Sequence, residues 1–314
     1  MMRTKEQFLM LFVLGGMMLA GLTACSGDDD TATNDNAPQT ADDGVKVRRL
    51  TITEADDGAA EARQALTRAS LTEDDGLTAK WTAGDALTYC NLSSLDVMSD
   101  EPYTGPLAAT TTASVSQFTG DVTCSKGDYL AVVYPAATFE TNERYTIALS
   151  GQDGTLAGLA TRFHYVYGKA LVNSVTDATA DATMPKMKSL LTVCKFSFVN
   201  KDGGAVIPIK SLSISYGGNG SDAGKYPQTA TVAIDANTEQ ADVHATGAAG
   251  SSEALTVTCS TAQDAVYVAL LPTAAARTFS FSVTNSSGTY SGTAKATLVE
   301  GEYVVATGLK LTKE

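Results

Sequence analysis

Cys25 is the residue whose type and position most clearly indicate covalent chemistry. It closes the run Leu22-Thr-Ala-Cys25, which follows a short basic stretch and the apolar segment Phe8–Leu22. That segment has the length of a signal peptide and is too short for a comfortable membrane span. The order is typical of a bacterial lipobox, in which a peptidase cuts between Ala24 and Cys25 and the thiol becomes a thioether to diacylglycerol.

The sequence therefore predicts a signal peptide at residues 1–24 and a lipid anchor at Cys25. Acyl chains, palmitate among them, bury CH₂ groups at about 0.8 kcal/mol each, and several such chains hold a protein on a membrane. An ordinary secretory signal followed by an incidental cysteine is the alternative. Residues 26–43 contain six Asp and no Lys or Arg. We expect residues 25–44 to form the lipidated cysteine and an acidic, disordered tether.

Four further cysteines, Cys90, Cys124, Cys194 and Cys259, follow the predicted anchor. In an exported protein they allow disulfides, with Cys90–Cys124 and Cys194–Cys259 as the pairs that lie within one half of the chain. Cys194 lies in an apolar run and is equally consistent with a small buried hydrophobe. No CxxC spacing is present, so a zinc site is not predicted.

Little else in the chain indicates catalysis. The 314 residues contain 2 His, His164 and His244, and no spacing that assembles a nucleophile, a base and an oxyanion hole. The net charge of −13 argues against nucleic acid, because such partners require a basic surface. We predict a protein that is not an enzyme and has no cofactor and no metal.

Most of the remaining chain alternates apolar and polar residues or forms short β-branched runs, separated by Gly, Asn and Asp. This pattern predicts an all-β protein of antiparallel sandwiches. Leu190–Val199 is nearly continuously apolar, which is typical of a central strand buried on both faces. The main strand candidates are Val45–Ile52, Leu77–Trp81, Asp85–Cys90, Ala108–Phe118, Tyr129–Tyr134, Arg144–Leu149, Leu190–Val199, Val206–Tyr216, Thr229–Ile234, Ala254–Cys259, Val266–Leu271, Thr278–Thr284, Thr289–Leu298 and Val304–Leu311. The domains are predicted at residues 45–186 and 187–314.

Several segments, taken together, resemble the fimbrillin family, the subunits of type V pili and related surface lipoproteins. Besides the lipobox, they are Thr67-Arg-Ala-Ser70, Trp81-Thr-Ala-Gly-Asp85, Met187–Phe198 and the closing Leu298-Val-Glu-Gly-Glu-Tyr303. Each motif is short, and their order and spacing carry the resemblance. It covers most of residues 45–314.

The resemblance implies two transthyretin-like β-sandwich domains in tandem and a processing step. In shaft pilins, an arginine-specific protease removes the first strand, and the open groove accepts a strand from a neighbouring subunit. On this sequence Val45–Ile52 would be the removable strand, with cleavage between Arg68 and Ala69. Arg63 is the second choice, and a solvated linker arginine is the competing interpretation of Arg68.

One departure from the family pattern concerns the C-terminal segment Gly301–Glu314. This segment resembles a last core strand, and few residues remain after it to serve as a strand donated to a neighbouring subunit. A tip or anchor subunit, or a solitary adhesin, is therefore favoured over a shaft subunit. The expected location is the surface of the outer membrane or a fimbria, with other pilus subunits or host or bacterial surface ligands as partners. The alternative function is a glycan-binding outer-membrane lipoprotein of a nutrient-uptake system, which would need exposed aromatic side chains.

Overall fold

The structure is a computed structural model that describes residues 45–55, 70–73, 77–141, 143–234, 241–245 and 253–314. These residues belong to one compact unit, residues 42–314. Within the described ranges the chain forms strands and one short helix, α1 (Leu156–Arg162), whose first turn is capped by Thr155. No helix in this part of the chain is long and apolar enough to cross a membrane.

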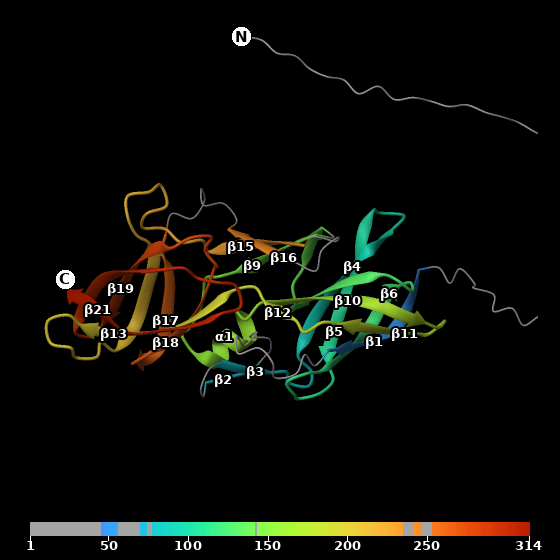
Figure 1. Cartoon of the computed structure of the whole chain (residues 1–314), viewed down its shortest axis with the longest axis horizontal. Helices are drawn as coiled ribbons and strands as arrows, with labels where there is room; N and C mark the ends of the chain where they lie inside the picture. Colours follow the sequence, from blue (N-terminus) through green and yellow to red (C-terminus); the bar gives the residue numbers. More distant parts are fainter. Residues whose placement is uncertain (1–44, 56–69, 74–76, 142, 235–240, 246–252) are drawn as a thin grey trace, which may run out of the picture. The chain divides into compact units, whose positions relative to one another are not determined.

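The first sheet contains eight strands from the first part of the chain and closes on itself (Figure 1). Its order is β11-β1-β6-β5-β4-β7-β10-β12, and an additional β10–β11 pairing joins the two sides. The strand alternation directs one row of side chains inward, so that this core holds Leu50, Ile52, Trp81 and Phe118, all fully buried. The strands are β1 (Lys46–Glu54), β4 (Ala86–Asp96), β5 (Glu101–Ala109), β6 (Gln117–Cys124), β7 (Tyr129–Tyr134), β10 (Val166–Val175), β11 (Thr179–Met184) and β12 (Lys188–Ser189).

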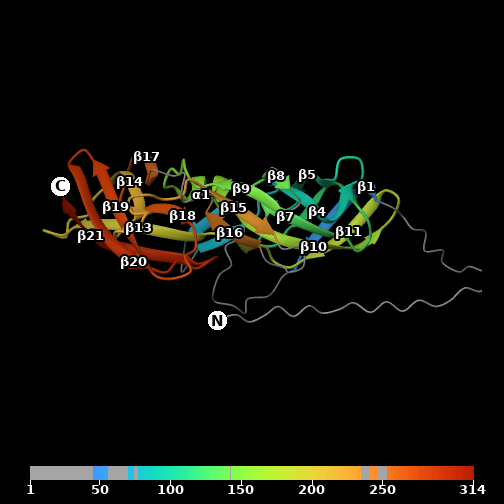
Figure 2. The same cartoon turned by 90° about the horizontal axis from the view of Figure 1, so that it is seen from above.

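The second sheet contains seven strands in the order β17-β14-β19-β20-β21-β13-β18 (Figure 2). The near-continuous apolar run forms β13, which pairs with β18 on one edge and in parallel with β21 on the other. The predicted strand at Leu190–Val199 is thus confirmed as one that is paired on both edges. Burial on both faces holds only for its first residues, because Lys195 and Ser197 are partly exposed. The strands are β13 (Thr192–Asn200), β14 (Ile209–Tyr216), β17 (Leu255–Gln263), β18 (Val266–Leu270), β19 (Arg277–Asn285), β20 (Gly288–Ala296) and β21 (Tyr303–Lys313).

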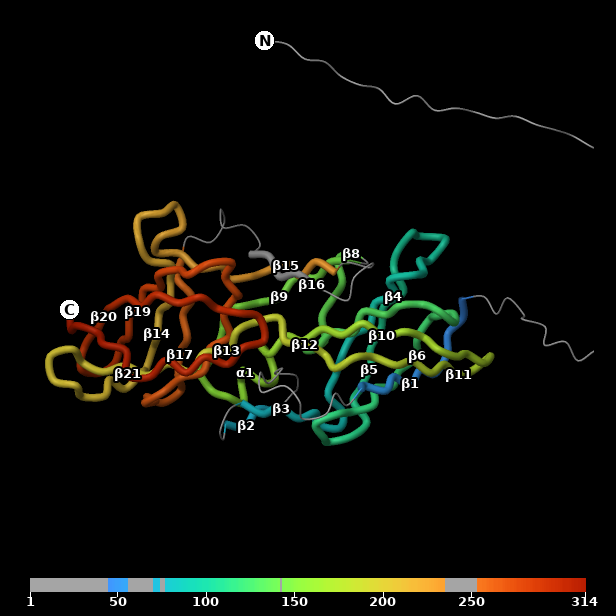
Figure 3. The backbone as a smooth tube through the Cα atoms, in the orientation of Figure 1, coloured from blue at the N-terminus to red at the C-terminus, as the bar shows by residue number. Residues whose placement is uncertain are grey.

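A third, four-stranded sheet joins segments from the two halves of the chain (Figure 3). Its order is β16-β15-β9-β8, and β9 pairs antiparallel with β15 from Thr229 opposite Ala148 to Ala233 opposite Arg144. A separate hairpin pairs two short strands that follow residue 69. The strands of the third sheet and the hairpin are β8 (Phe139–Thr141), β9 (Arg144–Ala148), β15 (Thr229–Ile234), β16 (Ala241–Ala245), β2 (Ser70–Glu73) and β3 (Leu77–Lys80).

The all-β architecture with two sandwich or barrel-like units matches the predicted fold class. The first sheet uses strands between Lys46 and Ser189, and the second uses strands from Thr192 onward. The division at residues 186 and 187 stays a prediction, because the third sheet and a shared apolar core also connect the two halves.

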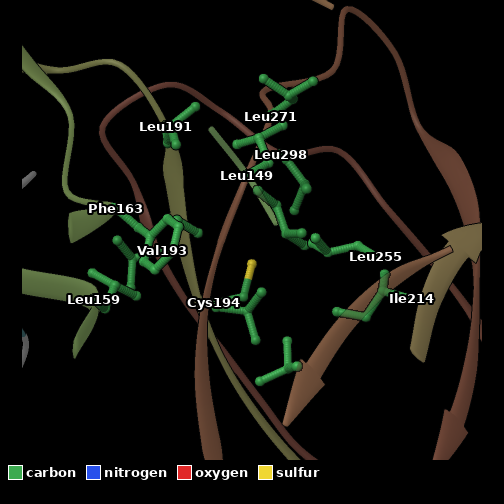
Figure 4. Packing of buried hydrophobic residues seen from close by; sticks show 14 of the residues in the cluster. Leu149, Leu159, Phe163, Leu191, Val193, Cys194, Ile214, Leu255, Leu271 and Leu298 are labelled. Atoms are coloured by element: carbon green, nitrogen blue, oxygen red, sulfur yellow. The ribbon is translucent and has the colours of Figure 1, made fainter. Parts of the chain in front are cut away.

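The larger core surrounds Cys194 (Figure 4). Leu159 and Phe163 enter it from the first half of the chain, and Ile214 and Leu255 enter it from the second. The four described cysteines are all buried and free, so neither Cys90–Cys124 nor Cys194–Cys259 is a disulfide in this structure. Burial raises the pKa of Cys90 and Cys194 to about 12 and that of Cys124 to about 11.

We expect these thiols to be unreactive in the folded protein, since the thiolate is the reactive form and is strongly disfavoured in an apolar core. In a chain with Cys25→Ala, titration with a disulfide reagent at pH 8 should detect almost no thiol before unfolding and all four in denaturant. A control with Ser125→Cys, next to Cys124, should add one rapidly reacting thiol. Two thiols or none in denaturant would instead indicate disulfides.

Candidate functional site

The candidate site is built around β1, the first described strand. β1 pairs antiparallel with β6 and in parallel with β11, so both of its edges are hydrogen-bonded. Its alternating sequence places Leu50 and Ile52 in the core at 0% exposure, whereas Lys46, Val47 and Arg49 are exposed. The inward row also carries a charged residue near each end, Arg48 and Glu54, which are 1% and 2% exposed.

Arg48 binds backbone carbonyls at the beginning of the strand. Its Nε donates to the carbonyl of Thr176 at 2.7 Å, and its Nη1 donates to the carbonyl of Cys124. A further Nη1 bond, at 3.3 Å, reaches the carbonyl of Lys46. A buried guanidinium is tolerated here because it meets several acceptors.

Glu54 binds donors at the other end of the strand. Its Oε2 accepts from Trp81 Nε1 at 3.1 Å and from the amide of Ser116 at 3.4 Å, and its Oε1 accepts from the amide of Met187 at 3.1 Å. The carboxylate therefore links β1 to three separate segments of the chain. Bonds to a buried charge are among the stronger ones in proteins.

The Trp81-Thr-Ala-Gly-Asp85 motif positions the indole that meets Glu54. Gly84 has φ of +92°, which a residue with a Cβ rarely adopts, and Asp85 accepts from the amide of Thr82 at 2.6 Å. The turn is thereby fixed directly after the tryptophan. The Trp81 ring packs edge-on against Phe118 and Tyr134, with centroid distances of 4.9 and 5.4 Å.

The β2–β3 hairpin is attached to the second sheet through Glu73. Lys195 donates to its two carboxylate oxygens at 2.6 and 2.8 Å, Tyr303 donates at 2.7 Å, and Tyr267 donates as well. These contacts, led by the bond from Lys195, lower the pKa of Glu73 to about 2. These contacts hold the hairpin on the second sheet and do not involve β1.

We expect the Glu73 contacts to make stability depend on pH. Because the pKa of Glu73 falls from 4.5 to about 2 on folding, its contribution is complete above pH 4.5 and is lost as the pH falls toward 2. Glu73→Gln should lower the free energy of unfolding by about 2 kcal/mol at pH 7, allowing for partial solvent screening. Urea unfolding should show that the difference in the free energy of unfolding between the native protein and Glu73→Gln decreases between pH 5 and pH 3.

The exposed Glu101 provides the control. Glu101→Gln should change the free energy of unfolding by less than about 0.5 kcal/mol at either pH. A Glu73→Gln deficit that stays constant from pH 7 to pH 3 would contradict the assignment.

The predicted processing and anchoring residues lie outside the described residues. These are Ala24, Cys25, Arg63, Arg68 and Ala69. The structure does place their neighbours, since β1 ends at Glu54 and β2 begins at Ser70. Sequence reasoning missed Arg48, Glu54 and Glu73 as site residues. For the first two the signal was present, because charged residues at inward positions of an alternating strand must find buried partners.

Neither the single tryptophan nor the tyrosine beside the surface hollow at Tyr216 offers an exposed ring face to a sugar. Trp81, the single tryptophan of the chain, is fully buried. A surface hollow beside Tyr216 offers a tyrosine ring, but Arg277 lies 3.7 Å from its centroid and also pairs with Asp222. Among the described residues no group of three His, Cys, Asp or Glu could hold a metal ion.

Comparisons with known proteins give distant similarities of structure only. No family model matches the chain, and no curated protein matches it. A proposed cell adhesion protein from Bacteroides ovatus is 11% identical, covers 86% of this chain and 96% of its own, and has a TM-score of 0.49. A proposed cell adhesion protein from Bacteroides eggerthii is 15% identical over 85% of this chain and 87% of its own, with a TM-score of 0.39. The shaft pilin SpaA from Lactobacillus rhamnosus GG is 10% identical, with 86% and 98% coverage and a TM-score of 0.33. Similarities this distant do not extend a function to this chain.

Proposed function

We propose that this chain is a fimbrillin-like surface lipoprotein that serves as a pilus component, at the tip or anchor, or as an adhesin, and that it assembles by strand exchange. The observation that carries the proposal is the place of β1. It is a doubly paired strand with one buried row of side chains, and it precedes residues 56–69, which contain both Arg63 and Arg68. A single cut after Arg68 would separate β1 from every later element.

The physical consequence of such a cut favours assembly. Loss of β1 would leave the facing edges of β6 and β11 without their ladder partner and would uncover the groove that Leu50 and Ile52 fill. Unpaired strand edges and an open apolar groove are both unfavourable in water. An extended segment from a partner subunit satisfies both at once. The Glu73 contacts to the second sheet do not involve the segment that is removed.

The test of processing is the N-terminal sequence of the protein recovered from the surface of its own cells. We expect a start at Ala69, and we expect Arg68→Ala to abolish that start, whereas Arg49→Ala in β1 should not. A start at Cys25 in the surface-exposed protein would overturn assembly by strand exchange. Electron microscopy of a deletion strain tests the pilus role, for which we expect fewer or shorter fibres.

The lipid anchor at Cys25 is part of the proposal and has its own test. Radiolabelled palmitate should be incorporated into the precursor and lost in Cys25→Ala. The unprocessed precursor of the same variant should leave the outer-membrane fraction, because it carries no acyl chain to hold it on the membrane. Labelling that persists in Cys25→Ala would contradict the assignment.

A further inference from the structure

The buried row of β1 carries a charge pattern with a direction. Arg48, Leu50, Ile52 and Glu54 alternate inward along the strand, with a cation near its beginning and a carboxylate at its end. The intervening Arg49, Thr51 and Thr53 are more exposed. A groove that accepts β1 is therefore chemically different at its two ends.

The end that faces Arg48 is a set of acceptors. The carbonyls of Cys124, at the end of β6, and Thr176, next to β10, both accept from the guanidinium. Without β1 these two bonds are lost, and an anionic group placed there would meet oxygen atoms. A replacing strand must bring a donor, and a long cationic side chain is suited to reach both carbonyls.

The end that faces Glu54 is a set of donors. Trp81 Nε1 and the amides of Ser116 and Met187 all point to the carboxylate, from three different segments of the chain. Without β1 the same donors would lack this acceptor, and a cation placed there would meet N–H groups. A buried donor left unsatisfied is costly, so a replacing strand must bring an acceptor, ideally a carboxylate.

We propose that the strand that takes the place of β1 carries Lys or Arg, two apolar residues, and Asp or Glu at alternate positions, in that order and parallel to β11. This inference rests on the proposed function, because it assigns the chemistry of the partner segment in strand exchange. The direction follows from the two ends: a reversed strand would place its carboxylate against carbonyls and its cation against N–H groups.

The pattern also indicates where the partner segment comes from. Read in the direction of β1, a cation followed at alternate positions by two apolar residues and a carboxylate occurs in the 314 residues only at Arg48–Glu54. Lys210-Ser-Leu-Ser-Ile-Ser-Tyr216 is a near match that ends without the carboxylate. Since processing would remove residues 48–54 from every copy, the donor segment lies outside these 314 residues.

The experiment uses the unprocessed chain from residue 25 onward, nicked after Arg68 by an arginine-specific protease, so that the groove itself is never mutated. Peptides compete with a labelled copy of residues 45–55, Val45–Ala55, at a urea concentration that permits exchange, and fluorescence anisotropy reports binding. We expect Arg48→Met and Glu54→Gln peptides to bind about 30-fold more weakly each, since each leaves buried partners unsatisfied. A peptide with Arg48 and Glu54 exchanged, which has the same composition, should bind at least about 100-fold more weakly.

Two matched peptides serve as controls. Arg49→Met and Thr53→Ala alter neighbouring but exposed side chains and should bind within about twofold of the native peptide. Equal binding of the native and end-exchanged peptides would overturn the inference, as would failure of the native peptide to bind. This outcome is separate from the proposed function: a start at Cys25 in cells would remove the role in assembly while the end-dependent exchange in vitro persisted.

Discussion

Replacing Trp81 with alanine is expected to lower the free energy of unfolding by about 4 kcal/mol, because it removes a large buried aromatic side chain and leaves a cavity. Trp81 is fully buried, and its ring packs edge-on against Phe118 and Tyr134. The substitution also removes one of the donors to the buried Glu54. Urea unfolding followed by circular dichroism measures the loss, since the chain has a single tryptophan and its fluorescence is lost with it.

Two variants separate the packing of Trp81 from its hydrogen bond. Trp81→Phe keeps most of the ring and loses the bond to Glu54, so it should cost about 2 kcal/mol. Met98→Ala removes an apolar side chain that is 90% exposed and should change stability by less than about 0.5 kcal/mol. If Trp81→Ala lost less than about 1.5 kcal/mol, the tryptophan would not be a principal part of the first core.

Arg48→Met in the intact chain is expected to cost about 3 kcal/mol, because methionine fills the apolar space but cannot donate to the carbonyls of Cys124 and Thr176. Hydrogen exchange should show where the loss occurs. We expect the amides at the beginning of β1 to exchange faster in the variant, while those of β13 in the second sheet keep their protection.

The neighbouring arginine is a matched control. Arg49 is exposed and pairs with Asp121 at 3.3 Å, with side-chain exposures of 59% and 73%. Arg49→Met should therefore change the free energy of unfolding by less than about 0.5 kcal/mol. Equal losses of stability in Arg48→Met and Arg49→Met would mean that the buried guanidinium of Arg48 does not stabilise the pairing of β1.

The strands that could be predicted are those in which the local order of apolar and polar residues determines which side chains are buried. Val45–Ile52 corresponds to β1 and Leu190–Val199 to β13, since strict alternation and a continuous apolar run each specify how a strand is buried. Ala108–Phe118 was predicted as one strand, and that prediction is wrong. β5 ends at Ala109 and β6 begins at Gln117. The Thr- and Ser-rich stretch between them has strand-like composition, but hydroxyls such as those of Thr111 and Ser116, 3.0 Å apart, bind locally and favour a turn.

The contacts that could not be predicted depend on residues far apart in the chain. Glu73 begins the short acidic run Glu73-Asp-Asp-Gly76, whose local sequence indicates only a turn. Its partners Lys195, Tyr267 and Tyr303 are 122, 194 and 230 positions away. The pairing of β9 with β15 is equally remote from any local pattern. The buried charges of β1 could be predicted in part. The alternating sequence places Arg48 and Glu54 on the inward row, but it does not indicate which groups they bind.

The two ladders of β1 also determine how the sheet bears tension. Register pairs run along β1 from Lys46 to Thr53 opposite β6 and from Arg49 to Glu54 opposite β11. A pull along the axis of this strand loads both ladders in shear, so that many hydrogen bonds must break together, whereas a pull across the axis would open them one after another. Forced separation is limited by the barrier rather than by equilibrium stability. A strand paired in this way therefore resists a pull along its axis more than its equilibrium stability alone would indicate.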